Sequence, residues 1–124
     1  MRFRPLAAAA ILSSLTFASG ASAQGGPMSV GLADDPALRS LHCAAALFME
    51  RYLIQEEKLA SPFDGDALQA GAKAWAESAA SLAGQEPGAF IQGQVFLAVS
   101  EQKLNSDALR QAQVKWCLAR TPPG

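Results

Sequence analysis

Apolar residues that recur every three or four positions constrain this chain most, because that spacing lays an apolar stripe along a helix. Pro and Gly divide the pattern into four helical segments, expected at about 35–59, 66–83, 87–104 and 106–120. Asp35 and Pro36 are residue types typical of a helix start. No stretch of the sequence sustains the apolar and polar alternation of a strand. The sequence therefore predicts one all-α domain over 34–121, with a short tail at 122–124.

The connections between these helices are short, so consecutive helices should run in opposite directions as a small up-down-up-down four-helix bundle. This topology brings the start of the first helix and the end of the last helix to the same end of the bundle. The only two cysteines, Cys43 and Cys117, lie in those two places. We expect a disulfide between them, worth about 4 kcal/mol for a loop of about 75 residues. The alternative is a pair of buried free thiols.

The first 23 residues have the three parts of a secretory signal peptide. Arg2 and Arg4 form a basic start, an apolar run covers 6–17, and Ala21-Ser22-Ala23 matches the A-x-A cleavage pattern. The apolar run is too short for a membrane anchor, which needs about 20 residues. We therefore expect cleavage before Gln24, a periplasmic or secreted protein without a stable membrane anchor, and a flexible leader at 24–33 with little to bury.

The charge of the mature chain excludes some partners. Removal of residues 1–23 leaves 124 − 23 = 101 residues, which fits one domain. Two of the ten Lys and Arg are lost, so the formal net charge becomes 8 − 11 = −3 with His neutral. A weakly acidic chain is a poor partner for nucleic acid or for an anionic membrane, which both attract basic surfaces.

The first helix carries apolar residues on more than one side. One stripe includes Leu38, Phe48 and Tyr52, and the residues Leu47, Leu53 and Ile54 form a second face. A helix that is apolar on several sides must be covered on several sides. Either this helix lies deep in the bundle, or the second face contacts a partner.

Few residues point to chemistry. His42 is the only histidine, and a metal site or a catalytic Cys-His pair would need further ligands or a free thiol. The C-x-x-C pattern of redox and haem-attachment sites is absent from the sequence. The residues Asp64-Gly65-Asp66 start like a calcium loop, but Leu68 stands at the third ligand position. We therefore expect no metal, no cofactor and no catalytic residues.

These observations favour a non-catalytic interaction module. The face of Leu47, Leu53 and Ile54 would form a homodimer or bind a periplasmic protein, in a chaperone-like or inhibitory role. The alternative is a bundle that holds a small apolar ligand or haem in its interior, near His42 and Met49 with the two tryptophans. The sequence does not show whether the acid Glu50, on the same helix, is buried.

Overall fold

A computed structural model describes residues 25–124, and the predicted signal peptide lies outside these described residues. Every regular element in the described part of the chain is a helix, so the all-α class is confirmed. The elements, in chain order, are η2 (Pro27–Val30), α2 (Pro36–Glu57), α3 (Gly65–Leu82), α4 (Pro87–Phe90), η3 (Ile91–Val95), α5 (Phe96–Glu101), η4 (Gln102–Leu104) and α6 (Asp107–Leu118).

The three long helices begin where the sequence predicts, because local capping residues fix each start. The Asp35 carboxylate accepts a hydrogen bond of 2.9 Å from the backbone N–H of Leu38, and Pro36 is the first residue of α2. Asp64 caps α3 and Ser106 caps α6 in the same way.

The third predicted helix, 87–104, is broken into short pieces. A single turn of α4 leads into a π-helical turn, η3, and then into α5 and the 3₁₀ turn η4. Gly93 lies in the π turn, where its high conformational freedom weakens a regular helix. Gly93 does not mark a close helix crossing, because a Cβ at this position would meet no atom within 4 Å.

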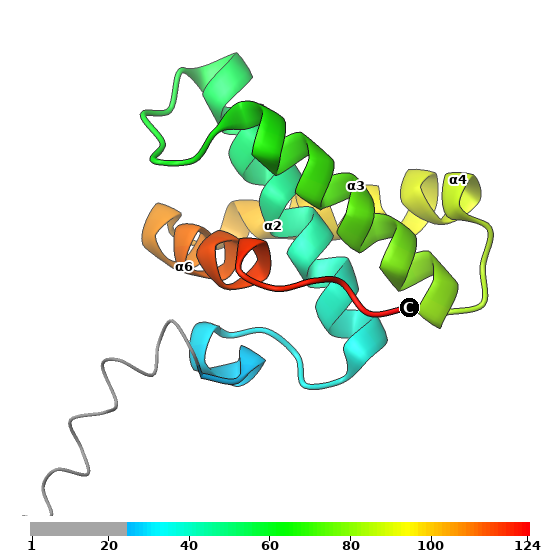
Figure 1. Ribbon diagram of the computed structural model, residues 1–124. Helices are drawn as coiled ribbons and strands as arrows, with labels where there is room; N and C mark the ends of the chain where they lie inside the picture. The colour runs from blue at the N-terminus through cyan, green and yellow to red at the C-terminus, as the bar shows by residue number, and fades with distance from the viewer. Residues whose placement is uncertain (1–24) are drawn as a thin grey trace, which may run out of the picture.

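Helix α2 is the centre of the molecule. It packs side by side with the antiparallel α3, with α6 on one side and α5 behind (Figure 1). All three of these helices contact α2, which explains why it is apolar on several sides. The four helical segments therefore form the predicted small bundle around α2, the third of them in pieces.

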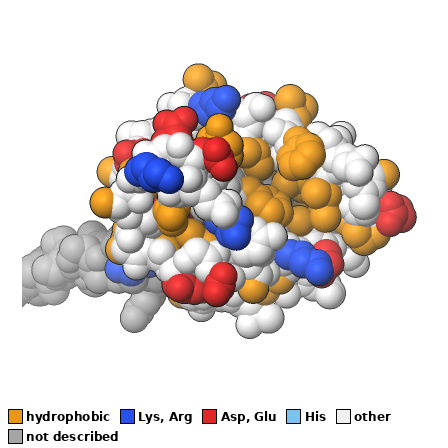
Figure 2. Space-filling model, turned by 90° about the horizontal axis from the view of Figure 1, so that it is seen from above, with side chains coloured by type: hydrophobic (Ala, Val, Ile, Leu, Met, Phe, Trp, Pro, Cys, Tyr) orange, Lys and Arg blue, Asp and Glu red, His pale blue; other side chains and the backbone are white. Residues whose placement is uncertain are grey.

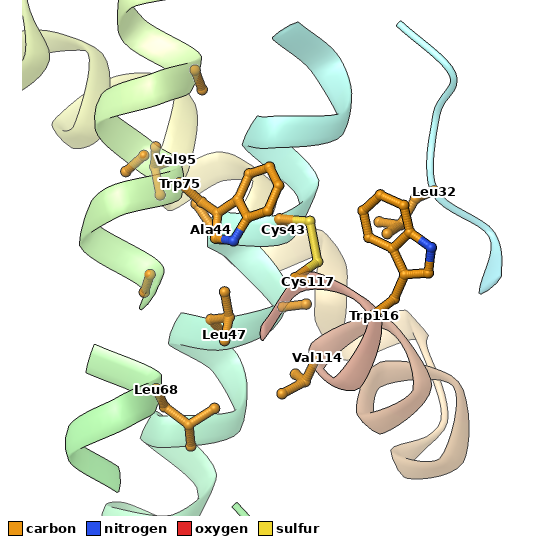
Figure 3. Close-up of a cluster of buried hydrophobic side chains, with 14 of the residues drawn as sticks. Leu32, Cys43, Ala44, Leu47, Leu68, Trp75, Val95, Val114, Trp116 and Cys117 are labelled. Atoms are coloured by element: carbon orange, nitrogen blue, oxygen red, sulfur yellow. A yellow bond between two sulfur atoms is a disulfide. The ribbon is translucent and has the colours of Figure 1, made fainter. Parts of the chain in front are cut away.

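The core lies where α2, α3 and α6 meet, and the disulfide is inside it. Cys43 and Cys117 are bonded, with their Cα atoms 5.8 Å apart, so the predicted disulfide is confirmed. Both cysteines are fully buried. Figure 3 shows Trp75 on one side of the disulfide, and Trp116 with Leu32 on the other.

The expectation that residues 24–33 bury little is wrong for the described part of this segment. Residues 27–30 form the 3₁₀ turn η2, and Val30 and Leu32 are buried in the core. The side chain of Gln113 donates to the carbonyl of Val30 at 3.1 Å, and the indole of Trp116 donates to Gly25 at 2.8 Å. Two apolar side chains and these hydrogen bonds hold the segment against α6.

The tail at 122–124 also has a place in the fold. The carbonyl of Pro123 accepts a hydrogen bond from the hydroxyl of Ser78 on α3. The two ends of the described chain therefore pack on different helices, with the start of the chain on α6 and the tail on α3.

Candidate binding groove

The predicted interaction face of Leu47, Leu53 and Ile54 is only partly exposed, and Leu53 lines a hollow with Met49. Leu47 is 0% exposed, and Ile54 is half-buried against the core. The cause is the close approach of α3, whose small residues leave room for Leu47. A Cβ on Gly71 would lie only 3.7 Å from a methyl group of Leu47 and 3.1 Å from one of Leu118. The predicted interaction face is therefore wrong at Leu47, which is an internal contact between α2 and α3.

Part of the exposed apolar surface lies instead on α2, α5 and the turn η4. Phe96 and Leu97 on α5 are 60% and 59% exposed, and Tyr52 on α2 is 47% exposed. Leu104, in the adjoining turn η4, is 87% exposed. Figure 2 shows one face of the molecule on which hydrophobic side chains gather in a hollow. Large exposed apolar residues that cluster in this way are typical of a binding surface.

Part of this surface is concave. A hollow of about 250 Å³, which we call the Tyr52–Phe96 groove, lies between α2, α3 and α5. Its exposed lining is mainly apolar. The residues that line the groove are Phe48, Arg51, Tyr52, Gln55, Gln69, Phe96 and Val99.

The π turn explains why two large apolar residues of α5 point outward. A π turn holds one residue more than an α turn, so it rotates the following residues by about 100° around the helix axis. After this turn Val95 and Ala98 face the core and are buried, whereas Phe96 and Leu97 are exposed. The break in the third helix thus supplies one wall of the groove.

Arg51 is the one charged residue that lines the groove. Its Nη1 donates a hydrogen bond of 2.8 Å to Oε1 of Gln55. Its Nε is buried and has no hydrogen-bond partner. The salt bridges within residues 25–124 join Arg110 to Glu50 and to Asp107, so no acid in the described chain pairs with Arg51.

A buried ion pair joins α2 to α6. Glu50 is fully buried, and its Oε1 accepts from Nε of Arg110 at 2.7 Å. Its Oε2 accepts from Ser61 at 2.6 Å and from Gln111 at 2.9 Å. Burial by itself lowers the pKa of Arg110, but hydrogen bonds and charge contacts with Glu50 and Asp107 outweigh it and raise the pKa above its usual value.

This ion pair is structural. Both carboxylate oxygens of Glu50 already have partners on α6 and the 58–64 connection, which leaves no open position for a substrate. The pair fixes α6 against α2. The sequence shows the acid on α2 and the Arg on α6, but the fold is needed to show that they meet in the interior.

The residues expected around an interior ligand do not converge. His42 lines a hollow of about 230 Å³ with Glu101 and Gln113, whereas Met49 lines a separate hollow with Leu53. Both tryptophans are buried in the core. The haem or ligand pocket predicted from His42, Met49 and the tryptophans is therefore wrong as a site.

The environment of His42 affects its charge. Burial lowers the pKa of His42 below its ordinary value of 6.5, and the negative charge of Glu101 offsets part of this effect. Within residues 25–124 we find no cluster of three or more His, Cys, Asp or Glu side chains that could hold a metal ion.

No protein-family model, curated protein or solved structure matches this chain. The helices in the described part of the chain include none that is both long and apolar enough to cross a membrane.

Proposed function

We propose that this protein is an exported, non-catalytic binding protein that holds a small apolar guest in the Tyr52–Phe96 groove. The observation that carries the proposal is the exposure of Phe96, at 60%, beside a concave apolar hollow. Exposed apolar area has a free-energy cost of about 25 cal/mol per Å², and a guest in the groove removes part of this area from water. A bound guest would therefore account for the exposure of Phe96 in the free protein.

The shape of the groove favours a small guest over a subunit interface. Small-molecule sites are concave, mostly apolar and positioned between helices of a bundle, as this groove is. A stable dimer needs a surface of about 800 Å² on each partner. Leu47, one residue of the face that we expected to form a dimer, is in the core.

The polar groups of the groove support binding without catalysis. They are the side chains of Arg51, Gln55 and Gln69 and the hydroxyl of Tyr52. Among the residues that line the groove, none is a nucleophile paired with a general base. Such groups can orient a guest by hydrogen bonds.

Export is supported by the disulfide. Disulfides form and persist outside the cytoplasm and are rare within it. The bond between Cys43 and Cys117 is consistent with an exported protein, as is the signal-like pattern at 1–23.

A neutral apolar dye tests the groove directly. We expect Nile red to bind the oxidised protein, with a rise in fluorescence. Phe96→Ser should weaken this binding about tenfold, equivalent to ~1.4 kcal/mol, because it removes an aromatic wall. Leu104→Ser is the matched control, since Leu104 is 87% exposed but does not line the groove.

Two results would contradict the proposal. One is the absence of dye binding, or an equal loss of binding in both variants. The other is a stable dimer in analytical ultracentrifugation that Phe96→Ser dissociates, which would make the groove a subunit interface.

A further inference from the structure

We infer that the guest is an anionic amphiphile, a small carboxylic acid whose apolar chain fills the Tyr52–Phe96 groove and whose carboxylate pairs with Arg51. This inference rests on the proposed function, because it names the chemical class of the guest in the same groove. It depends on a separate observation: Arg51 lines the groove, and its buried Nε has no hydrogen-bond partner.

The Nε of Arg51 is buried without a hydrogen-bond partner. A buried donor without an acceptor destabilises the protein. Nη1 has a partner in Gln55, at 2.8 Å, but Nε has none. Nε and Nη2 form one edge of the guanidinium fork, and this edge matches the two oxygens of a carboxylate. Because Nε is buried, pairing with a bound carboxylate requires the Arg51 side chain to rotate and turn this edge toward the groove.

A second feature of the groove is its charge. Arg51 is the one charged residue in the lining, and the described chain holds no salt-bridge partner for it. Gln55 and Gln69 add neutral amides beside it. The hydrogen bond from Arg51 to Gln55 engages the amide oxygen, which leaves the Gln55 N–H₂ group as a further donor. An anion therefore meets one cation and amide donors, and no acid of the lining repels it.

The apolar part of the groove has a buried and an exposed portion. Phe48 and Val99 are partly buried and pack against the core, whereas Phe96 in the same lining is 60% exposed. The hollow of about 250 Å³ is below the range of about 300–1,000 Å³ typical of drug-sized ligands. A single alkyl chain of medium length fits these limits better than a bulky ring system. We therefore choose octanoate as the probe.

The experiment compares octanoate with 1-octanol, which has the same chain and no charge. Amide NMR spectra of the oxidised protein are recorded during titration with each compound. We expect octanoate to bind at least tenfold more tightly than octanol, with shifts at Arg51 and Val99, and added salt should weaken only octanoate.

Three variants separate the charge from the groove. Arg51→Gln should lower the affinity for octanoate to that for octanol and leave the affinity for octanol unchanged. Arg51→Lys should keep part of the preference, because it keeps the charge but loses the Nε–H. Lys73→Gln removes an exposed cation of α3 that does not line the groove, and it should change neither affinity.

The outcomes also distinguish this inference from the proposed function. Equal affinities for octanoate and octanol in the native protein, or equal weakening of both by Arg51→Gln, would overturn the anion inference and leave the apolar groove intact. Failure of both compounds to bind would overturn both. A preference for octanoate that Arg51→Gln leaves unchanged would place the anion elsewhere and also overturn the inference.

Discussion

At the scale of single residues, the ion pair of Glu50 and Arg110 shows how the interior of this small bundle tolerates charge. Removal of two charges from water is costly, and the Coulombic attraction offsets that cost only with good geometry and further hydrogen bonds. Here Ser61 and Gln111 donate to the second carboxylate oxygen of Glu50. The pair therefore stabilises one orientation of α6 on α2, because any other would leave a buried charge unpaired.

Loss of one partner of the Glu50–Arg110 pair should destabilise the protein. We predict that Glu50→Ala lowers the free energy of unfolding by about 3 kcal/mol, because Arg110 keeps only its contact with Asp107. Urea denaturation measures this change. Glu57→Ala, at an exposed position near the end of α2, is the control and should change stability by less than about 0.5 kcal/mol. Equal stabilities of the two variants would show that the pair contributes nothing.

His42 should make stability depend on pH. Because burial lowers its pKa below 6.5, the unfolded chain binds a proton at a higher pH than the folded chain. The stability contributed by neutral His42 is thus complete above the unfolded pKa and is lost as the pH falls through about 6.5 toward the folded pKa. We predict that His42→Gln flattens the decline in unfolding free energy between about pH 7.5 and about pH 5. An unchanged slope in this window would contradict the assignment.

At the scale of elements, the packing of α2 depends on small residues of α3 and on the irregular third segment. The side chain of Leu47 fits under Gly71, so α3 lies close to α2. The π turn η3 then turns Phe96 outward. One close helix pair and one irregular helix together leave the Tyr52–Phe96 groove between them.

Two glycine substitutions separate these roles. Gly93→Ala should stabilise the protein by about 0.5–1 kcal/mol, because a Cβ there meets nothing within 4 Å and Ala is the better helix former. Gly71→Ala should stabilise the protein less than Gly93→Ala does, or destabilise it, because the new Cβ would lie 3.1 Å from the Leu118 side chain. Chemical denaturation of both variants measures the difference. The reverse order of stabilities would contradict the packing described for α3.

Helix starts could be predicted from the sequence, because Asp35, Asp64 and Ser106 act on the amides of their own first turns. The break in the third helical segment could not be predicted, because apolar periodicity does not distinguish a π turn from a continuous helix. The prediction of the interaction face was wrong at Leu47 for a related reason. The pattern shows that α2 is apolar on several sides, but only the positions of α3, α5 and α6 decide which side stays exposed.

At the scale of the whole molecule, the disulfide joins the central helix to the last helix and closes most of the domain. Topology and residue type together were enough to predict it, because Cys43 and Cys117 were the only possible pair. We did not predict the groove from the sequence. The first and last residues of its lining, Phe48 and Val99, are more than 50 positions apart, and they meet only in the folded bundle.

Removal of the disulfide should cost much of the stability. We predict that the double variant Cys43→Ala/Cys117→Ala loses about 4 kcal/mol, because a long loop is released in the unfolded chain. Ala is chosen since both sites are fully buried and a hydroxyl would lack a partner. Urea denaturation of the variant against the oxidised protein measures the loss. A difference near zero would show that the bond constrains the unfolded chain little.

Occupancy of the Tyr52–Phe96 groove by a small apolar guest can be observed directly. The most direct measurement is isotope-edited NMR of the oxidised protein with octanoate, which detects magnetisation transfer between the alkyl chain and protein side chains. The account predicts transfer to the methyl groups of Val99 and to the rings of Phe48 and Phe96. Transfer to Met49 and Leu53, which line a different hollow, or no transfer at all, would contradict it.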